Sequence, residues 1–325
     1  YKIVVTTGIT DAVPNSAAMC AAQTPPQPDA CLLPLNRQYT AYFTTKVPQI
    51  YDLDEGQFTG GKGIDLYTDP ADGKTYAYVT ADAEGWYVID VTDPTSPTVV
   101  KTHKMTNSGV TWFDRGVDVD QESSLLALTE DIRYADGNQY GYIRFYDLTN
   151  NPQGNPPTTP ADPKVVGREK LAEAYSGVPM RLSLMNNYAY VATVNVGVQV
   201  VDINAAKAFM QTGGQADGST IVGIFDTWGS GYRNPTDIVA YKGGRAALTT
   251  TSGHLVLLDI NIPQLPQEMT AFKPGPSPNN HNFDSAWRVA VAPEYAYTPS
   301  PLAGEGGGEG TNVIDLAVTS SMAGR

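Results

Sequence analysis

Charged residues recur at one position of a repeating pattern, and their types could hold a polar ligand or a cation. Five short segments, GKGIDLYTD, DRGVDVDQE, VPMRLSLMN, NPTDIVAYK and SAWRVAVAP, each carry one of them. The three acids and two guanidinium groups are Asp65, Asp118, Arg181, Asp237 and Arg288. If the fold brings them to one level of a central channel, they predict a ring of structural ion pairs. The alternative is a polar ligand or cation site at the channel mouth.

Two acidic stretches could bind calcium, which prefers six to eight oxygen ligands. DVDQE brings Asp118, Asp120 and Glu122 together, and TDPADGK adds Asp69 and Asp72 in a tight turn. Neither stretch has the spacing of an EF-hand loop. We therefore expect solvated turns and no cofactor, with calcium at Asp118, Asp120 and Glu122 as the alternative.

Hydrolytic motifs are not visible in the sequence. It has neither the G-x-S-x-G nucleophile elbow nor the H-E-x-x-H zinc motif. The three histidines, His103, His254 and His281, are far apart and have no ligand-like spacing. They could act as acids or bases only if the fold brought them together beside the channel carboxylates. Trp112 and Trp228 are expected near turns between repeats, where they could stack on sugars or pack against other side chains.

The elements that must position these residues repeat at intervals of 55 to 57 residues. Each repeat contains an apolar strand that ends in an aspartate, as in YVIDVTDP. These aspartates are Asp90, Asp147, Asp202, Asp259 and Asp315. An Asp at a strand end accepts hydrogen bonds from backbone N–H groups two or three residues on, which starts an Asx-turn. We therefore expect these residues to form turns and not to bind a ligand.

Each repeat predicts about four short strands and no helix of useful length. In the first repeat these are GKGIDLYTD, KTYAYVTA, the YVID strand and PTVVKTHKM. Four strands per repeat, arranged radially, are typical of a β-propeller blade. The sequence therefore predicts an all-β fold, a β-propeller with four complete blades and a partial fifth.

The first repeat, YAYVTADAEGWYVIDVTDPTSPTVV, closely resembles the LVIVD repeat, a β-propeller repeat of bacterial and archaeal surface proteins. NYAYVATVNVGVQVVDI in the third repeat resembles it over two strands but lacks the proline turn. The other repeats carry insertions, notably over 150–162 and 301–310. The resemblance covers roughly residues 60–325, and it implies a fold and a cell-surface location while saying little about chemistry.

The N-terminal 45 residues do not follow the repeat. YKIVVTTGITDAVPN and PLNRQYTAYFTT resemble the C-terminal part of a bacterial Ig-like β-sandwich domain of the S-layer type, with a cysteine-bearing insertion between them. We therefore expect a partial Ig-like domain over 1–45, a linker or closing strand over 46–62, and the propeller over 63–325. Both ends are expected to cut through domains of a larger chain.

Cys20 and Cys31 flank a polar loop, CAAQTPPQPDAC, that has few ways to stay ordered. A disulfide would fix this loop and would place the protein outside the cytoplasm. Two unrelated free thiols are the alternative.

Composition excludes two kinds of partner. The net charge of −13 repels phosphates, so nucleic acid is not expected. No run approaches the roughly 18 apolar residues that span a bilayer. We expect a non-catalytic extracellular or cell-surface module for adhesion or assembly, with protein subunits or a surface polysaccharide as partner. The alternative is a propeller hydrolase or lyase that uses channel-facing Asp, Arg and His residues on glycans or small molecules.

Overall fold

The computed structural model describes residues 61–104, 109–153, 157–171, 177–214, 217–272, 288–292, 295–300 and 310–315. All of them belong to Tyr51–Arg325, one of two compact units into which the chain divides. The predicted Ig-like segment 1–45, most of the linker 46–62, and the Cys20–Cys31 pair lie outside the described residues.

The described residues form four four-stranded antiparallel sheets and one three-stranded sheet, which confirms the all-β prediction and its four complete repeats. We call these sheets blades 1 to 5. Blade 1 holds β1 (Gly63–Thr68), β2 (Thr75–Thr80), β3 (Trp86–Asp90) and β4 (Thr98–His103). Blade 2 holds β5 (Val110–Asp120), β6 (Leu125–Tyr134), β7 (Gln139–Asp147) and β8 (Lys164–Lys170).

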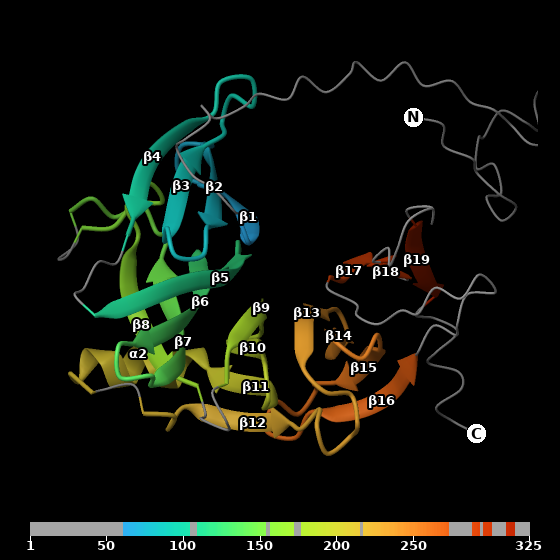
Figure 1. Ribbon diagram of the computed structural model, residues 1–325. Helices are drawn as coiled ribbons and strands as arrows, with labels where there is room; N and C mark the ends of the chain where they lie inside the picture. The colour runs from blue at the N-terminus through green and yellow to red at the C-terminus, as the bar shows by residue number, and fades with distance from the viewer. Residues whose placement is uncertain are drawn as a thin grey trace, which may run out of the picture. The chain divides into compact units, whose positions relative to one another are not determined.

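Blades 3 to 5 repeat this order. Blade 3 holds β9 (Pro179–Met185), β10 (Tyr188–Thr193), β11 (Gly197–Asp202) and β12 (Ile221–Phe225). Blade 4 holds β13 (Pro235–Tyr241), β14 (Arg245–Thr250), β15 (Leu255–Asp259) and β16 (Gln267–Phe272). Blade 5 holds β17 (Ala290–Ala292), β18 (Tyr295–Ser300) and β19 (Gly310–Asp315). The first, inner strand of each blade contacts that of the next, as β1 does with β5, β5 with β9, and β9 with β13 (Figure 1).

One helix, α2 (Ile203–Gln211), interrupts the repeat, and the expectation of no helix was wrong here. Asp202, the residue that ends β11, caps the helix by accepting a hydrogen bond from the backbone N–H of Ala205 at 3.0 Å. The segment that follows contains alanine, lysine and glutamine, which favour helices. Burial of Ile203 and Ala206 fixes the helix against the sheets.

The middle strands bury both faces because each blade packs between neighbours. In β2, TYAYVT, Tyr76 and Tyr78 pack with Leu126 and Leu128 of blade 2, while Ala77 and its neighbours form a separate cluster. Large side chains therefore fill the gap between blades on one face. The same β-branched, alanine and aromatic alternation recurs in the second strand of blade 3.

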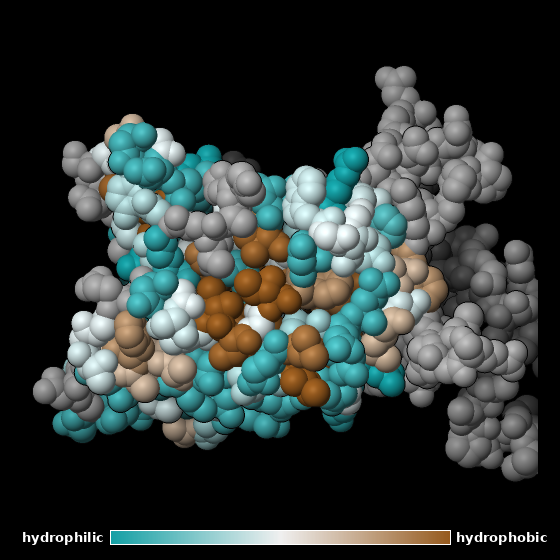
Figure 2. Space-filling view, turned by 90° about the horizontal axis from the view of Figure 1, so that it is seen from below, coloured by the Kyte–Doolittle hydropathy of each residue, from teal (hydrophilic) through white to brown (hydrophobic). Residues whose placement is uncertain are grey.

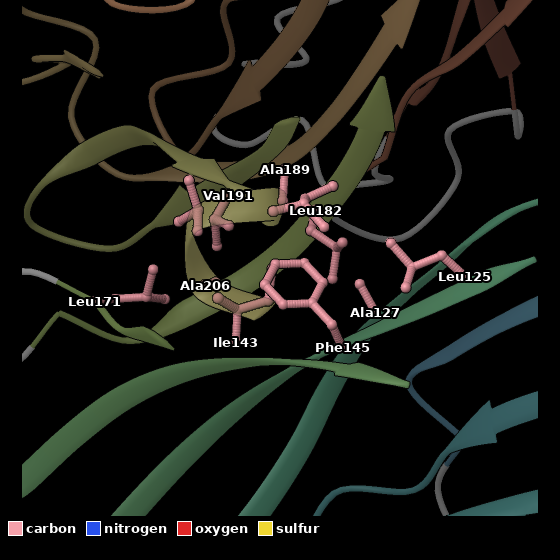
Figure 3. Close-up of a cluster of buried hydrophobic side chains, with 11 residues drawn as sticks. Leu125, Ala127, Ile143, Phe145, Leu171, Leu182, Ala189, Val191 and Ala206 are labelled. Atoms are coloured by element: carbon pink, nitrogen blue, oxygen red, sulfur yellow. The ribbon is translucent and has the colours of Figure 1, made fainter. Parts of the chain in front are cut away.

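Figure 3 shows the corresponding core between blades 2 and 3. Ile143 and Phe145 of β7 gather with Leu182 of β9, Val191 of β10 and Ala206 of α2. All five side chains are at most 5% exposed. This contact joins consecutive repeats by hydrophobic burial, the main stabilising term of the fold.

Candidate functional site

The inner-strand acids are held by backbone groups of the next blade. An Oδ2 atom of Asp65 accepts a hydrogen bond from the Val119 N–H at 2.7 Å. Asp118 accepts one from the Leu184 N–H at 2.6 Å. Asp237 accepts one from the Val289 N–H at 3.0 Å. Each inner strand is a sheet edge with unpaired N–H groups, so each carboxylate satisfies a donor that the edge leaves open.

The two arginines of the predicted ring play other parts. Arg181 donates from Nη1 to the carbonyl oxygen of Arg115 in blade 2, at 3.3 Å. In blade 3 it is Ser183, two residues on, whose Oγ accepts the Ala240 N–H at 3.0 Å. The spacing of the repeats predicted Arg181 as the blade 3 equivalent of Asp118 and did not identify Ser183. Ser183 nevertheless precedes Leu184 as Asp118 precedes Val119.

Arg288 links the ends of the repeat array. Its Nη2 donates to the carbonyl oxygen of Lys62, 226 residues earlier in the chain, at 2.6 Å. Lys62 immediately precedes β1, and Arg288 lies two residues before β17, so this contact joins the start of blade 5 to the start of blade 1.

The five inner-strand residues do not form the expected ion pairs with one another in the part of the chain that the structure describes. Within the described ranges, no nitrogen–oxygen pair within 4.0 Å joins two ring members. Burial raises the pKa of Asp118 well above its usual range, although the Leu184 hydrogen bond opposes this shift. Burial and the nearby Arg288 charge lower the pKa of Arg181 to about 10. Desolvation makes a charged ring costly, whereas backbone donors satisfy the carboxylates locally.

The strand-end aspartates are placed as turn formers. Asp90 accepts the Thr92 N–H at 3.0 Å, Asp147 the Thr149 N–H at 2.9 Å, and Asp259 the Asn261 N–H at 2.9 Å. Asp202 makes the equivalent contact as the cap of α2. The side chain of Asp315 lies outside the described part of the chain.

The proposed calcium ligands point to different partners. Asp118 contacts blade 3, whereas Asp120 accepts hydrogen bonds from the Glu122 N–H at 3.0 Å and the Ser123 hydroxyl at 2.6 Å. Among the residues that the structure describes, no group of three His, Cys, Asp or Glu side chains is placed to hold a metal ion.

The two histidines that the structure describes do not contact the inner acids. His103 ends β4, the outermost strand of blade 1, and stacks on Trp86 with ring centroids 3.8 Å apart. Burial lowers the pKa of His103 to about 4. His254 lies in blade 4, where its Nδ1 is 2.8 Å from the Ser252 hydroxyl. His281 lies outside the described residues.

A second polar cluster, not anticipated from the sequence, lies where blade 2 extends beyond blade 1. Asp82, in the β2–β3 turn, and Asp114 of β5 exchange backbone hydrogen bonds of 3.0 and 3.1 Å. β5 begins four residues before Asp114, at Val110, and pairs there with the end of β6. The sheet of blade 2 therefore continues past the point where blade 1 ends.

Buried charges concentrate at the base of this extension. Asp114 and Glu130 stand directly opposite each other on β5 and β6 and are 2% and 1% exposed. Glu130 forms an ion pair with Arg144 at 3.0 Å. On the opposite face, the fully buried Asp131 pairs with Arg133 at 2.9 Å and with Arg115 at 3.5 Å.

Asp114 is the distinctive member of this cluster. Its Oδ2 atom is buried and has no hydrogen-bond partner. Burial raises the pKa of Asp114 well above its usual range, and the neighbouring Glu130 charge adds to the shift. A neutral carboxylic acid of this kind can donate a hydrogen bond or a proton. WFDRG and TEDIRY carry most of these charges and YIRFYD carries Arg144, but only strand pairing brings them together.

The described residues contain no helix with the length and apolarity that crossing a membrane requires.

Comparison with known proteins supports the repeat. A family model described as the LVIVD repeat matches residues 73–104 and 176–211. These ranges fall in blades 1 and 3, the two repeats on which the sequence resemblance depends. No curated protein matches the chain.

Many solved structures are similar to this chain, among them three at 10–13% identity. One is described as the Mitotic Checkpoint Complex, with a TM-score of 0.48 and 13% identity over 88% of this chain and 74% of that chain. Chaetomium thermophilum Sqt1 bound to the N-terminus of the ribosomal protein L10 has a TM-score of 0.49 and 10% identity, over 78% and 59%. The WD40 beta propeller domain of Doa1 has a TM-score of 0.42 and 13% identity, over 81% and 70%. LVIVD repeats and four four-stranded antiparallel sheets together support the predicted β-propeller.

Proposed function

We propose that the chain is a non-catalytic binding module of an extracellular surface protein, in which the propeller presents a rigid face to other copies of this chain as protein subunits of a surface assembly. The inner acids that could have done chemistry are engaged by backbone N–H groups of neighbouring blades. The function is therefore sought on the outside of the blades, where the side chains are not needed to hold the repeats together.

The observation that carries this proposal is an exposed apolar patch on blades 3 and 4. Ile224 of β12 is 48% exposed, and Ile262 and Leu265 of the β15–β16 turn are 59% and 57% exposed. β12 touches this turn through Gly223, where an added Cβ would come 2.2 Å from the carbonyl oxygen of Pro263, whereas Ile224, the next residue, points to the other face of the strand. We call these three residues the outer apolar patch. Figure 2 shows apolar side chains gathered on the face over β12.

An exposed cluster of large apolar side chains is typical of a protein interaction site. β12 is also an edge strand, so its backbone offers unpaired hydrogen-bonding groups beside the patch. A protein subunit could use both features, whereas a polysaccharide could use only the second.

Sedimentation velocity of the purified chain over a range of concentrations tests this proposal. We expect reversible self-association that Ile224→Lys and Leu265→Lys abolish without lowering the thermal midpoint, because both side chains are already exposed. Val100→Lys is the matched control, since Val100 is 43% exposed on β4 of blade 1. A monomer at every concentration, or equal loss in the control, would contradict the proposal.

A second candidate is the hydrolase or lyase, which the buried Asp114–Glu130 pair favours because one acid of such a pair can stay protonated. In this second candidate the Asp114–Glu130 pair, and not the inner-strand acids, would supply the catalytic groups. Release of reducing ends from a glycan, lost in Asp114→Asn, would support this candidate over the binding module.

A further inference from the structure

The side chains on one face of the blade 2 extension form a surface that is separate from the outer apolar patch. Strand register places Trp112 and Asp114 of β5 on the same face as Glu130 of β6 and Arg144 of β7. The same face carries Tyr140 and Tyr142 of β7 and, on β8, Arg168 and Lys170. We call this face the aromatic–cationic wall, with members Trp112, Tyr134, Tyr140, Tyr142, Arg144, Arg168 and Lys170 above Asp114 and Glu130.

Cations and aromatic rings alternate along the wall. The Arg168 guanidinium lies 3.8 Å from the Tyr142 ring centroid, and the Lys170 ammonium lies 4.2 Å from that of Tyr140. Arg144 lies 5.4 Å from the Trp112 ring. These contacts hold the cations in fixed positions over the sheet.

Two guanidinium groups of the wall face each other. Arg144 and Arg168 are directly opposite on β7 and β8, an arrangement in which like charges repel. Glu130 pairs with Arg144, while no carboxylate of the described residues lies within 4.0 Å of Arg168. Two facing cations are unusual on a chain of net charge −13. An anion beside Arg168 would relieve the repulsion between them.

Unused polar atoms point to the same ligand. Trp112 Nε1 and Arg168 Nε are buried donors without a hydrogen-bond partner, and Asp114 Oδ2 is likewise unpartnered on a side chain that is 2% exposed. Buried polar atoms are almost always paired, so three on one face mark a place where the described chain does not supply the expected hydrogen bonds. An indole N–H and a guanidinium are donors that favour negative charge above them, and the Arg168 and Lys170 cations of the wall add to this preference for a carboxylate.

We propose that the aromatic–cationic wall binds an acidic polysaccharide built from uronate sugars. The cations and donors would hold the sugar carboxylates, the rings would pack on the C–H faces of the sugars, and the phenol groups would bind hydroxyls. Tyr134, 38% exposed and edge-on to Tyr140 at 5.6 Å, continues this surface outward. An acidic peptide would satisfy the cations but would leave the tyrosine hydroxyls and ring faces with less to bind.

This inference rests on the proposed function, a binding module, and adds a ligand to it. The wall lies on blade 2 and the outer apolar patch on blades 3 and 4, so the two can fail separately. If Ile224→Lys loses self-association but binds uronate normally, the patch mediates association and the wall binds its ligand independently.

Isothermal titration of the whole chain with hexameric oligogalacturonate and an alginate hexamer tests the wall. We expect one uronate hexamer to bind, and its methyl-esterified form and cellohexaose to bind at least about tenfold more weakly, because the charge-assisted bonds are lost. Hexaglutamate should also be at least about tenfold weaker. The absence of uronate binding, or equal binding of hexaglutamate, would overturn the proposal.

Two variants locate the binding. Arg168→Gln removes the cation that no described carboxylate pairs with and should weaken binding about tenfold or more. Trp112→Phe keeps an aromatic ring, removes the indole donor and should also weaken binding. Lys242→Gln, in the exposed β13–β14 turn, is the control with the same change in charge. Equal affinity of Arg168→Gln and the control would overturn the proposal. If Arg168→Gln does not fold, Trp112→Phe takes its place, and unchanged uronate affinity in that variant would overturn the proposal.

Discussion

The carboxylate of Asp118 accepts a hydrogen bond from the backbone N–H of Leu184, 2.6 Å away and 66 residues later in the chain. Asp65 and Asp237 make the same contact with the following blades. A side chain on the inner strand of one blade thus satisfies a backbone donor on the inner strand of the next. The contact fixes the relative position of consecutive blades.

Removal of the Asp118 acceptor should destabilise the fold. Asp118→Ala leaves the Leu184 N–H without its partner, so we expect a loss of about 1–3 kcal/mol in the free energy of unfolding. Asp118→Asn keeps an acceptor oxygen and should lose less. Urea denaturation followed by tyrosine and tryptophan fluorescence measures both, and equal stability of wild type and Asp118→Ala would contradict the structural role.

Asp114 should make stability fall as pH rises. Its pKa in the folded state is raised well above the unfolded value of about 3.9, so the folded state binds the extra proton between these two values. Asp114→Asn removes the titration and should gain stability relative to wild type as pH rises through this window. Denaturation curves from about pH 4 upward measure the difference, which would be constant with pH if Asp114 did not titrate in this way.

His103 should have the opposite effect at acidic pH. Its folded-state pKa of about 4 lies below the ordinary value of 6.5, so the unfolded state binds a proton that the folded state rejects. Stability from this residue is present above about pH 6.5 and is lost as pH falls toward 4. His103→Phe keeps a ring stacked on Trp86 and should lose less stability on acidification than wild type. Parallel losses in the two proteins would rule this out.

The cap of α2 predicts a local effect. Asp202→Ala removes the acceptor for the Ala205 N–H and should cost about 1 kcal/mol. Asp202→Asn retains a good capping side chain and serves as the control. Hydrogen exchange should show faster opening of α2 in Asp202→Ala alone, and unchanged exchange would show that the cap does not stabilise the helix.

The repeat and its turns can be predicted from local sequence patterns. Strand periodicity and the strand-ending aspartates depend on neighbours within a few residues, so YVIDVTDP could reveal both a strand and its Asx-turn. The matched repeats, the four-stranded sheets and the hydrogen bonds of Asp90, Asp147 and Asp259 agree with those expectations. The helix after Asp202 was missed because the repeat led to the expectation of another turn.

The contacts of the charged residues depend on how the blades pack together. Whether Asp118 meets an arginine or a backbone N–H depends on the offset between two blades, which no local pattern encodes. Because of this offset, Ser183 and not Arg181 accepts the backbone hydrogen bond in blade 3, and Arg288 donates to the carbonyl oxygen of Lys62. Likewise Asp114, Glu130, Arg144 and Arg168 lie on four different strands, and their shared face exists only because antiparallel register pairs them. Pairing between strands that are distant in the sequence brings these charges onto one surface. Burial then shifts their pKa values and leaves some of their polar atoms without a hydrogen-bond partner.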